Sequence, residues 1–349
     1  MTVTAKLLNL GLDFFFQQQM PVDDSGALVP VRIMNVQRSG LQIAGENIEG
    51  HVELSGSDYD LNLTVGDWVL LDNDTHRLVR RLDRKSLFKR RAPGADRREQ
   101  LIAANIDTLF IVSSCNSDFN EARIERYLAI AREADVMAVI ILTKTDLVDD
   151  SGDFIQRAGK LAPAVQVAAV NALQVDSLEC LGPWLKNGQT IALLGSSGVG
   201  KSTLTNTLLG LQEISTRAIR EDDAKGRHTT TSRSMHQLPG GAWLLDTPGM
   251  RELQLTDVKT GLDDVFAEIS ALASSCRFTD CDHVNEPGCS VNEAIEAGEI
   301  DQTRLDRWRK LAREEAFNRT SIAERRASDK ALGRMYKSII SDKKSRRNT

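Results

Sequence analysis

Residues 29–82 alternate apolar and polar positions in short runs, which read VPVRIMNV, GLQI, NIEGHVEL, VGDWVLL and HRLVRRL. Clusters of Gly, Asp and Ser separate these runs. The alternation predicts about five short antiparallel strands. Such strands fit a small barrel of the OB type, a fold that often carries nucleic acid. An SH3-like or purely structural barrel would give the same pattern, so periodicity leaves these alternatives open.

Ahead of the strands, the segment KLLNLGLDFFFQQQM predicts a packed amphipathic helix. Its apolar patch at Phe14, Phe15 and Phe16 has no basic leader and no small-residue cleavage site, and Asp13 interrupts it, so we expect no signal peptide. No apolar run in the sequence approaches the ~18 residues of a membrane span, so we expect no membrane partner.

From about residue 100 to 257, short apolar runs alternate with helical patterns. DTLFIVSS, MAVIILTK, AVQVAAV, TIALLGSS and AWLLDTPG predict strands, and EARIERYLAIAREA and KSTLTNTLLG predict helices. This alternation indicates a mainly parallel sheet with helices on both faces. Ligands of such sheets bind at the carboxyl ends of the strands.

The last part of the chain combines a cysteine and histidine cluster with a helical stretch rich in Arg and Lys from Asp301 onward. Trp308 and Leu311, at helical spacing, could dock this helix, and the final DKKSRRNT is typical of a mobile basic tail. We therefore predict three domains: a helix and barrel over 1–98, an α/β domain over 99–257 and an α-rich domain over 258–349. Pro93 and Gly94 would lie in the first linker.

Charge is unevenly distributed along this chain of net charge −5. Residues 77–98 hold ten Lys and Arg against two acids, and residues 304–349 hold fifteen against six. Two basic segments on an acidic body favour contact with RNA or DNA. The alternative is that each basic segment is only a solvated face.

The motif GSSGVGKS follows the apolar strand TIALL and precedes the predicted helix KSTLTNTLL, which is the context of a phosphate-binding loop. Its glycines let backbone N–H groups surround phosphate oxygens at a helix N-terminus. Lys201 could bridge the outer phosphates and Ser202 could bind Mg²⁺. The predicted phosphate-binding residues are Gly195, Ser196, Ser197, Gly198, Val199, Gly200, Lys201, Ser202 and Thr203.

The motif Asp246-Thr247-Pro248-Gly249 ends the strand AWLLD some fifty residues after the phosphate loop. Asp246 would act on Mg²⁺ through water, and the Gly249 N–H would contact the terminal phosphate. Between the two motifs, KGRHTTTSR offers threonine hydroxyls that could complete the Mg²⁺ site while a γ-phosphate is present. We assign Thr230 to this role, although the pattern does not separate it from its neighbours.

A guanine-binding loop, LTKTD, precedes the phosphate loop in this sequence, the reverse of the usual order. Asp146 could accept hydrogen bonds from the guanine N1–H and exocyclic amine, which adenine cannot supply, and the Lys144 stem could lie along the base. Backbone groups of AVNAL could contact the base edge. The order is that of a GTPase domain circularly permuted, which preserves the pocket because the strands pair in the same way. The predicted base-binding residues are Thr143, Lys144, Thr145, Asp146, Asn171 and Ala172.

Three cysteines and a histidine, Cys276, Cys281, His283 and Cys289, lie within fourteen residues. Thiolates and imidazole suit one structural Zn²⁺, and four ligands would leave no open position for chemistry. Cys115 and Cys180 are in apolar surroundings and are predicted to be core thiols.

The residue that orients the attacking water is less apparent. Met250 stands where many GTPases carry a glutamine after this motif, and it cannot make the required hydrogen bonds. His228 is our candidate for the catalytic residue. Arg251 could stabilise charge or be a plain surface arginine. We therefore predict slow intrinsic hydrolysis that depends on a partner to order the switch segments.

Taken together, GSSGVGKS, GRHTTT, DTPG and CRFTDCDHVNEPGC in this order resemble the small-ribosomal-subunit-dependent GTPases of the RsgA, or YjeQ, family over nearly the whole chain. The resemblance implies an OB-fold, a permuted GTPase domain and a zinc domain that bind the small ribosomal subunit and its 16S rRNA late in assembly. It implies hydrolysis of GTP to GDP that the subunit stimulates, and a cytoplasmic location; we expect a monomer. This chain departs from the family pattern with Thr143 in place of Asn, which concerns nucleotide affinity, and with Asn171-Ala172 in place of Ser-Ala.

Three other functions fit parts of the sequence. A nucleotide-gated RNA-binding switch would need only incidental hydrolysis, and Met250 favours it. An ATP-dependent enzyme would share the phosphate loop, and Asp146 argues against it. A metal-dependent nucleic-acid enzyme would use the Cys and His cluster, and its four filled ligands argue against that.

Overall fold

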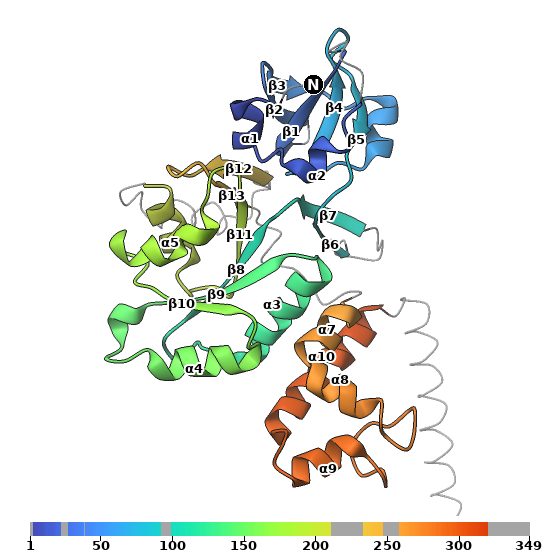
Figure 1. Ribbon diagram of the computed structural model, residues 1–349, viewed down its shortest axis with the longest axis vertical. Coiled ribbons are helices and arrows are strands. Elements are labelled where there is room, and N and C mark those ends of the chain that lie inside the picture. The colour runs from blue at the N-terminus through green and yellow to red at the C-terminus, as the bar shows by residue number, and fades with distance from the viewer. Residues whose placement is uncertain are drawn as a thin grey trace, which may run out of the picture.

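The computed structural model of the chain describes residues 3–21, 27–37, 39–91, 99–210, 233–246 and 258–319. Figure 1 shows a β-rich N-terminal domain, a central α/β domain and a helical C-terminal domain that follow one another along the long axis of the molecule. The predicted fold class is confirmed in these three parts. The predicted linker at Pro93 and Gly94 and the predicted basic tail lie outside the described residues. No helix in the described ranges is long and apolar enough to cross a membrane.

Five antiparallel strands, paired in the order β3-β2-β1-β4-β5, form the N-terminal domain as predicted. The first half of the long strand β1 pairs with β4 and its second half with β2, the arrangement typical of a partly open five-stranded barrel. Alternate side chains of β1, including Val31 and Ile33, enter one apolar cluster, which explains the period of two. The elements are β1 (Leu28–Gln37), β2 (Gly40–Gly45), β3 (Glu49–Val52), the 3-10 helix η1 (Gly56–Leu61), β4 (Trp68–Asp72) and β5 (Leu78–Arg81).

The single amphipathic helix predicted at the N-terminus is wrong: the segment forms two short helices, α1 (Ala5–Asn9) and α2 (Phe14–Gln17). Gly11 separates them with a φ of +90°, which a residue with a side chain rarely adopts. A Cβ at Gly11 would also lie 2.6 Å from the Gly188 carbonyl oxygen. The predicted apolar face is buried, as Leu7 and Phe16 show. The close approach of Gly188 to Gly11 nevertheless interrupts the helix between α1 and α2.

The central sheet has the order β10-β9-β8-β11-β13-β12, with every pair parallel except β12 with β13. The five predicted strands of this domain are all present. Strand β12 was not predicted, because RSMHQ shows no clear apolar alternation. The elements are β8 (Thr108–Ser114), α3 (Glu121–Glu133), β9 (Met137–Thr143), η2 (Thr145–Leu147), α4 (Gly152–Leu161), β10 (Gln166–Ala169), η3 (Asp176–Trp184), β11 (Thr190–Leu194), α5 (Lys201–Leu208), β12 (Arg233–Gln237) and β13 (Trp243–Asp246).

The two faces of the central sheet enter different apolar clusters. On one face, Leu109 and Ile111 of β8 pack with Leu128 of α3. On the other face, Phe110 and Val112 pack with Leu204 of α5. Helices therefore cover both faces, as the buried, near-continuous apolar strands predicted.

The barrel and the central sheet are one hydrogen-bonded sheet. Strand β1 pairs antiparallel with β12, with Asn35 opposite Ser234 and Val36 opposite Arg233. The N-terminal helices reinforce this junction, because the Trp243 indole N–H donates to the Asn9 carbonyl at 2.7 Å. The barrel is thus attached to the strand that follows the predicted switch threonines.

A buried arginine lies at the same junction. Arg32 of β1 is only 2% exposed, and burial lowers its pKa to about 10. Its guanidinium donates to the Leu10 carbonyl at 2.5 Å and to the Thr190 hydroxyl at 2.7 Å. One side chain therefore joins the N-terminal helices, the barrel and the central sheet.

Strands β6 (Leu87–Arg91) and β7 (Glu99–Ala104) form a separate antiparallel hairpin. The hairpin lies between the barrel and the central domain in Figure 1. The proposed boundary between residues 98 and 99 would fall within it.

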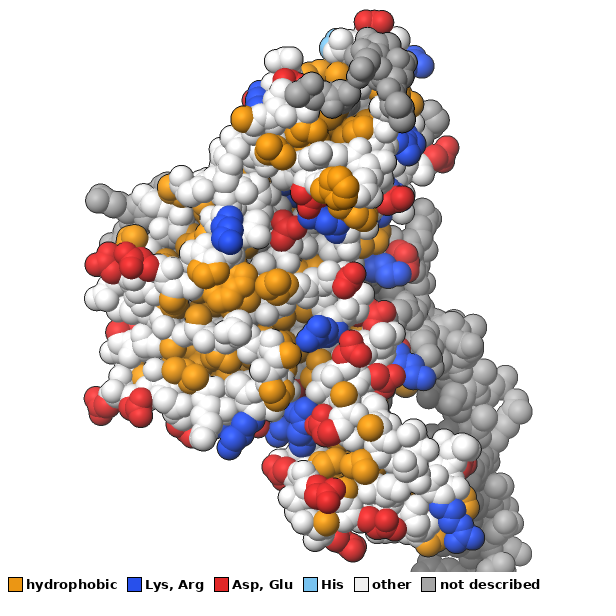
Figure 2. Space-filling model, in the orientation of Figure 1, with side chains coloured by type: hydrophobic (Ala, Val, Ile, Leu, Met, Phe, Trp, Pro, Cys, Tyr) orange, Lys and Arg blue, Asp and Glu red, His pale blue; other side chains and the backbone are white. Residues whose placement is uncertain are grey.

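Several cations of the basic segment 77–98 are committed to contacts within the protein. Arg84 forms an ion pair with the buried Asp67 at 2.7 Å, and Lys85 contacts Asp13 and Asp107 at 2.8 and 2.7 Å. Lys89 pairs with Glu99 across the hairpin. Figure 2 likewise shows Lys and Arg interspersed with Asp and Glu on this face of the molecule. Arg84, Lys85 and Lys89 are therefore paired with acids of the protein itself, and Lys85 links the N-terminal helices to the central domain.

The C-terminal domain consists of α7 (Lys259–Val265), α8 (Ala267–Ala273), α9 (Ser290–Glu296) and α10 (Gln302–Arg319). Leu311 is buried and Trp308 packs against the same apolar cluster, so the predicted docking of this helix is confirmed. Helix α7 lies directly on α3, because a Cβ at Gly261 would be 2.1 Å from the Ala129 carbonyl oxygen. This cluster is continuous with one face of the central sheet.

Ion pairs complete the contact between α3 and α10. Glu125 of α3 is fully buried between Arg304 and Arg307, at 3.0 and 2.8 Å. Burial raises the Glu125 pKa, and the two arginines oppose this shift. Arg307 also contacts Glu121 at 3.0 Å. Removing one partner of such a buried group typically destabilises a protein by about 3–5 kcal/mol, because a buried charge is left uncompensated.

Candidate functional site

The predicted phosphate loop lies between β11 and α5, at the carboxyl end of a central strand. Gly195 packs against the end of β8, where a Cβ would be 2.3 Å from the Val112 carbonyl oxygen. Gly198 and Gly200 have φ values of +83° and +92°. The glycine spacing therefore matches two left-handed positions and one close backbone approach.

Lys201 and Ser202 begin α5, so their backbone N–H groups belong to the first turn of a helix. The Lys201 ammonium donates to the carbonyl oxygens of Gly195 and Ser196 at 2.7 and 2.5 Å. The Lys201 side chain thus lies across the loop, and its ammonium would exchange these carbonyl contacts for contacts with phosphate oxygens. Ser202, one turn from Gly198, could direct its hydroxyl to Mg²⁺.

Thr143, at the end of β9, connects the predicted guanine loop to the phosphate loop. It is completely buried, and its hydroxyl oxygen lies 2.5 Å from the Val199 carbonyl and 3.0 Å from the Ser113 carbonyl. A hydroxyl has one proton, so it donates to one of these carbonyls at a time. Thr143 was predicted to bind the nucleotide, and in the structure its hydroxyl contacts the backbone of β8 at Ser113 and of the phosphate loop at Val199.

Replacing Thr143 by valine is expected to weaken binding of GTP and GDP roughly tenfold. The buried Val199 carbonyl would lose its hydrogen-bond donor, and the phosphate loop would lose its contact with β9. Fluorescent-nucleotide titration measures this effect. Thr143→Ser, which keeps the hydroxyl, is the matched control and should bind within about twofold of the parent protein. Equal affinity of the valine and serine variants would contradict the role of the hydroxyl.

Lys144 follows directly with a φ of +62°, a left-handed conformation that turns the chain out of β9. Thr145 and Asp146 then lie in the short helix η2, with Asp146 exposed at the carboxyl edge of the sheet. The Asp146 carboxylate is therefore accessible to the guanine base of a bound nucleotide.

Asn171 and Ala172 follow β10, the neighbour of β9. The Asn171 side-chain oxygen accepts the Leu173 N–H at 3.0 Å, which fixes a tight turn. The Thr207 hydroxyl of α5 donates to the Ala172 carbonyl at 2.6 Å. This contact from the phosphate-loop helix holds the predicted base-edge loop beside the pocket. Sequence reasoning missed Thr207, which appears there only as a polar position within a helix.

The remaining predicted nucleotide residues are only partly described. Asp246 ends β13, next to the phosphate-loop strand β11, and its backbone pairs with Ser234 of β12. His228, Thr230, Gly249, Met250 and Arg251 lie outside the described residues. The structure therefore brings the guanine, base-edge and phosphate motifs to one edge of the sheet, with β13 ending at the same edge.

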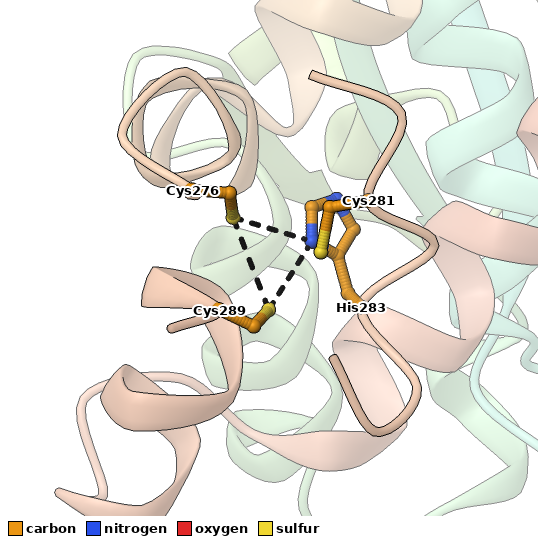
Figure 3. A group of neighbouring side chains, drawn as sticks. All are labelled: Cys276, Cys281, His283 and Cys289. Atoms are coloured by element: carbon orange, nitrogen blue, oxygen red, sulfur yellow. Dashed lines mark hydrogen bonds between the residues drawn. The ribbon is translucent and has the colours of Figure 1, made fainter. Parts of the chain in front are cut away.

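The four predicted metal ligands are brought together in the C-terminal domain. Figure 3 shows Cys276, Cys281, His283 and Cys289 with their side chains directed toward a common point. Their ligand atoms all lie within 4.8 Å of one another. The Cys276 sulfur lies 3.9 Å from the Cys289 sulfur, and the His283 Nδ1 lies 3.4 Å from the Cys289 sulfur. Ligands around one tetrahedral Zn²⁺ are about 3.5–3.8 Å apart, so this quartet could hold such an ion.

The elements around the quartet fix its shape. Cys289 is the N-cap of α9, and Cys276 follows α8. His283 has a φ of +58° and its ring packs 5.6 Å from the Trp308 ring, while Arg309 donates to the His283 carbonyl. Helix α10 therefore supports the ligand loop directly.

The other two cysteines differ from each other. Cys115 is buried, as predicted, and burial raises its pKa to about 11. Cys180 is exposed, so its assignment as a core thiol is wrong. It lies in the 3-10 helix η3, whose buried positions are Leu178 and Leu181, and the local apolar composition did not resolve which residues face the core.

Comparisons with known proteins agree with this geometry. Residues 81–256 match the family model described as RsgA GTPase. The chain is 51% identical to the small ribosomal subunit biogenesis GTPase RsgA 2 of Vibrio parahaemolyticus, covering 98% of this chain and 95% of that protein. It is 47% identical to the small ribosomal subunit biogenesis GTPase RsgA of Mesorhizobium japonicum, covering 94% of this chain and 95% of that protein.

Two solved structures have a similar fold. The crystal structure of YjeQ from Thermotoga maritima matches with a TM-score of 0.58 at 24% identity, over 81% of this chain and 97% of that chain. The crystal structure of YloQ, a circularly permuted GTPase, matches with a TM-score of 0.58 at 22% identity, over 86% and 99%. The permuted arrangement predicted from the motif order is thus confirmed. With these motifs on the predicted strands and curated relatives matching almost end to end, the chain belongs to the RsgA GTPase family.

Proposed function

We propose that this GTPase binds the small ribosomal subunit during its late maturation in the cytoplasm and hydrolyses GTP to GDP and phosphate when bound there. The observation that carries the proposal is the joining of the guanine loop to the phosphate loop through Thr143 at one edge of the permuted sheet. Curated relatives of similar length, named as small ribosomal subunit biogenesis GTPases, support the partner.

In this proposal the nucleotide lies along the carboxyl edge of the sheet. Asp146 reads the guanine, Asn171 and Ala172 contact its edge, and the residues 195–203 surround the phosphates. Ser202, Thr230 and Asp246 would hold Mg²⁺, which would supply positive charge to neutralise the phosphates. The Gly249 N–H contacts the terminal phosphate, and His228 orients the attacking water in place of the glutamine that Met250 replaces.

The C-terminal quartet is proposed to hold one structural Zn²⁺. The support is its donor set and the spacing of its ligand atoms. We propose that this domain and the barrel contact 16S rRNA, with residues 304–349, where Lys and Arg outnumber acids by fifteen to six, supplying positive charge.

Steady-state GTP hydrolysis with Mg²⁺, with and without purified small ribosomal subunits, tests the proposal. We expect slow intrinsic turnover and a large stimulation by small subunits that is confined to GTP, with ATP and large subunits as controls. Unchanged turnover with either subunit would leave a nucleotide-gated switch instead.

In the same assay, His228→Ala should keep GTP affinity and lose stimulated turnover; full stimulation of this variant would remove His228 from the mechanism.

A further inference from the structure

The N-terminal turn of α3 lies beside the phosphate loop. Helix α3 follows β8, which is the direct neighbour of β11, so the loop after each strand opens at the same edge of the sheet. The Arg123 guanidinium donates to the Ser196 hydroxyl at 3.0 Å. Arg123, a charged residue outside the phosphate loop, therefore contacts a residue of the phosphate-loop motif directly.

Arg123 stands where a cation does not favour the helix. It occupies the first turn of α3, and its N–H donates to the Asn120 cap at 3.0 Å. The positive end of the helix dipole lies there, so a cation in this turn is unfavourable for the helix. Its position is explained by the contact outside the helix and not by stabilisation of the helix.

Ser196 is held from two sides. Its hydroxyl accepts from Arg123, and its carbonyl accepts from the Lys201 ammonium at 2.5 Å. Lys201 is the lysine expected to bridge the outer phosphates. Any shift of the Ser196 peptide would therefore move the acceptor that competes with phosphate for this lysine.

The base of the Arg123 side chain is fixed by neighbouring contacts. Glu121, two residues earlier, pairs with Arg157 of α4 and Arg307 of α10, both at 3.0 Å. The next turn of α3 carries the buried Glu125. The helix turn that presents Arg123 is thus anchored both within the central domain and to the C-terminal domain.

We propose that Arg123 is a positioning residue for nucleotide binding, which acts through the Ser196 hydroxyl to hold the phosphate loop in its nucleotide-binding shape. The side chain also places a positive charge beside the loop, which favours an anionic ligand over water. Its role is exerted on binding more than on the chemical step, because its contact is with the loop.

Two single variants and their combination test this proposal in the full chain. Arg123→Ala and Ser196→Ala should each raise the KM for GTP and the dissociation constant for GDP about two- to fivefold, the range of exposed charge-assisted contacts. kcat should change less than about twofold. The double variant should bind GTP and GDP no more weakly than whichever single variant binds them less tightly, because the two substitutions remove the same contact. Arg123→Lys, which keeps the charge, should recover part of the loss.

Arg132→Ala is the matched control, since it removes a cation from the exposed last turn of the same helix. Its KM should equal that of the parent protein. Losses that multiply in the double variant would overturn the action through Ser196. A lowered melting temperature with unchanged KM in Arg123→Ala would overturn the positioning role altogether and leave a structural one.

Discussion

Asp146→Asn is expected to weaken GTP binding at least about a hundredfold while improving the binding of xanthosine triphosphate. The Asp146 carboxylate would accept hydrogen bonds from the guanine N1–H and exocyclic amine, and contacts to a charged group contribute about 1.5–3 kcal/mol each. An asparagine offers one acceptor and a donor, so its amide N–H₂ would face the guanine amine. Xanthine carries a carbonyl oxygen at that position and accepts the donor.

Competition of GTP and xanthosine triphosphate against a fluorescent nucleotide measures the change in preference. Asp149→Asn is the matched control, because Asp149 is an exposed acid three residues further along. It should leave both affinities unchanged. Retention of GTP preference by Asp146→Asn would show that this loop does not read the base, and an ATP-binding function would then need to be reconsidered.

Cys289→Ser is expected to abolish stable zinc binding and to unfold much of the C-terminal domain. Cys289 is 2% exposed, and its sulfur lies within 4 Å of both the Cys276 sulfur and the His283 Nδ1. In zinc-finger peptides the metal contributes about 10–16 kcal/mol of binding free energy that is also folding free energy. The loss should be large because α9 begins at this residue and α10 supports the ligand loop.

Zinc content by atomic absorption and limited proteolysis of the C-terminal helices measure this outcome. Cys180→Ser is the matched control, since it removes an exposed thiol outside the quartet. It should retain about one zinc ion per chain. Intrinsic GTP hydrolysis should persist in Cys289→Ser, because the nucleotide motifs lie on the central sheet. A zinc-loaded, protease-resistant Cys289→Ser protein would contradict the proposed ligand set.

The sequence predicted the strands of the barrel and of the central domain well where burial imposes a period. The five barrel strands and the strands β8, β9, β10, β11 and β13 were each recognised from their apolar pattern. Strand β12 was missed because only Met235 in RSMHQ is buried, so its pattern resembles an exposed loop. The break between α1 and α2 was also missed, since it depends on the approach of Gly188 to Gly11, residues distant in sequence.

The candidate site was predicted residue by residue only where a motif carries its own geometry. The glycines at 195, 198 and 200 have a spacing that follows from the backbone conformation of the loop. The metal quartet has a spacing that follows from the number of ligands that a metal needs. The contacts of Thr143 and Thr207 could not be read in the same way, because each hydroxyl bonds to the backbone of another loop.

By itself, the sequence predicted the chemistry of this protein: a candidate guanine loop before a phosphate loop predicted the permuted sheet, and three thiols with an imidazole predicted a metal site. Local spacing is sufficient for these conclusions because each motif makes its contacts through its own backbone and side chains. The tertiary structure alone decided how the domains are joined. The pairing of β1 with β12, and the burial of Glu125 between Arg304 and Arg307, depend on backbone and charge partners far apart in the chain, which no local periodicity encodes.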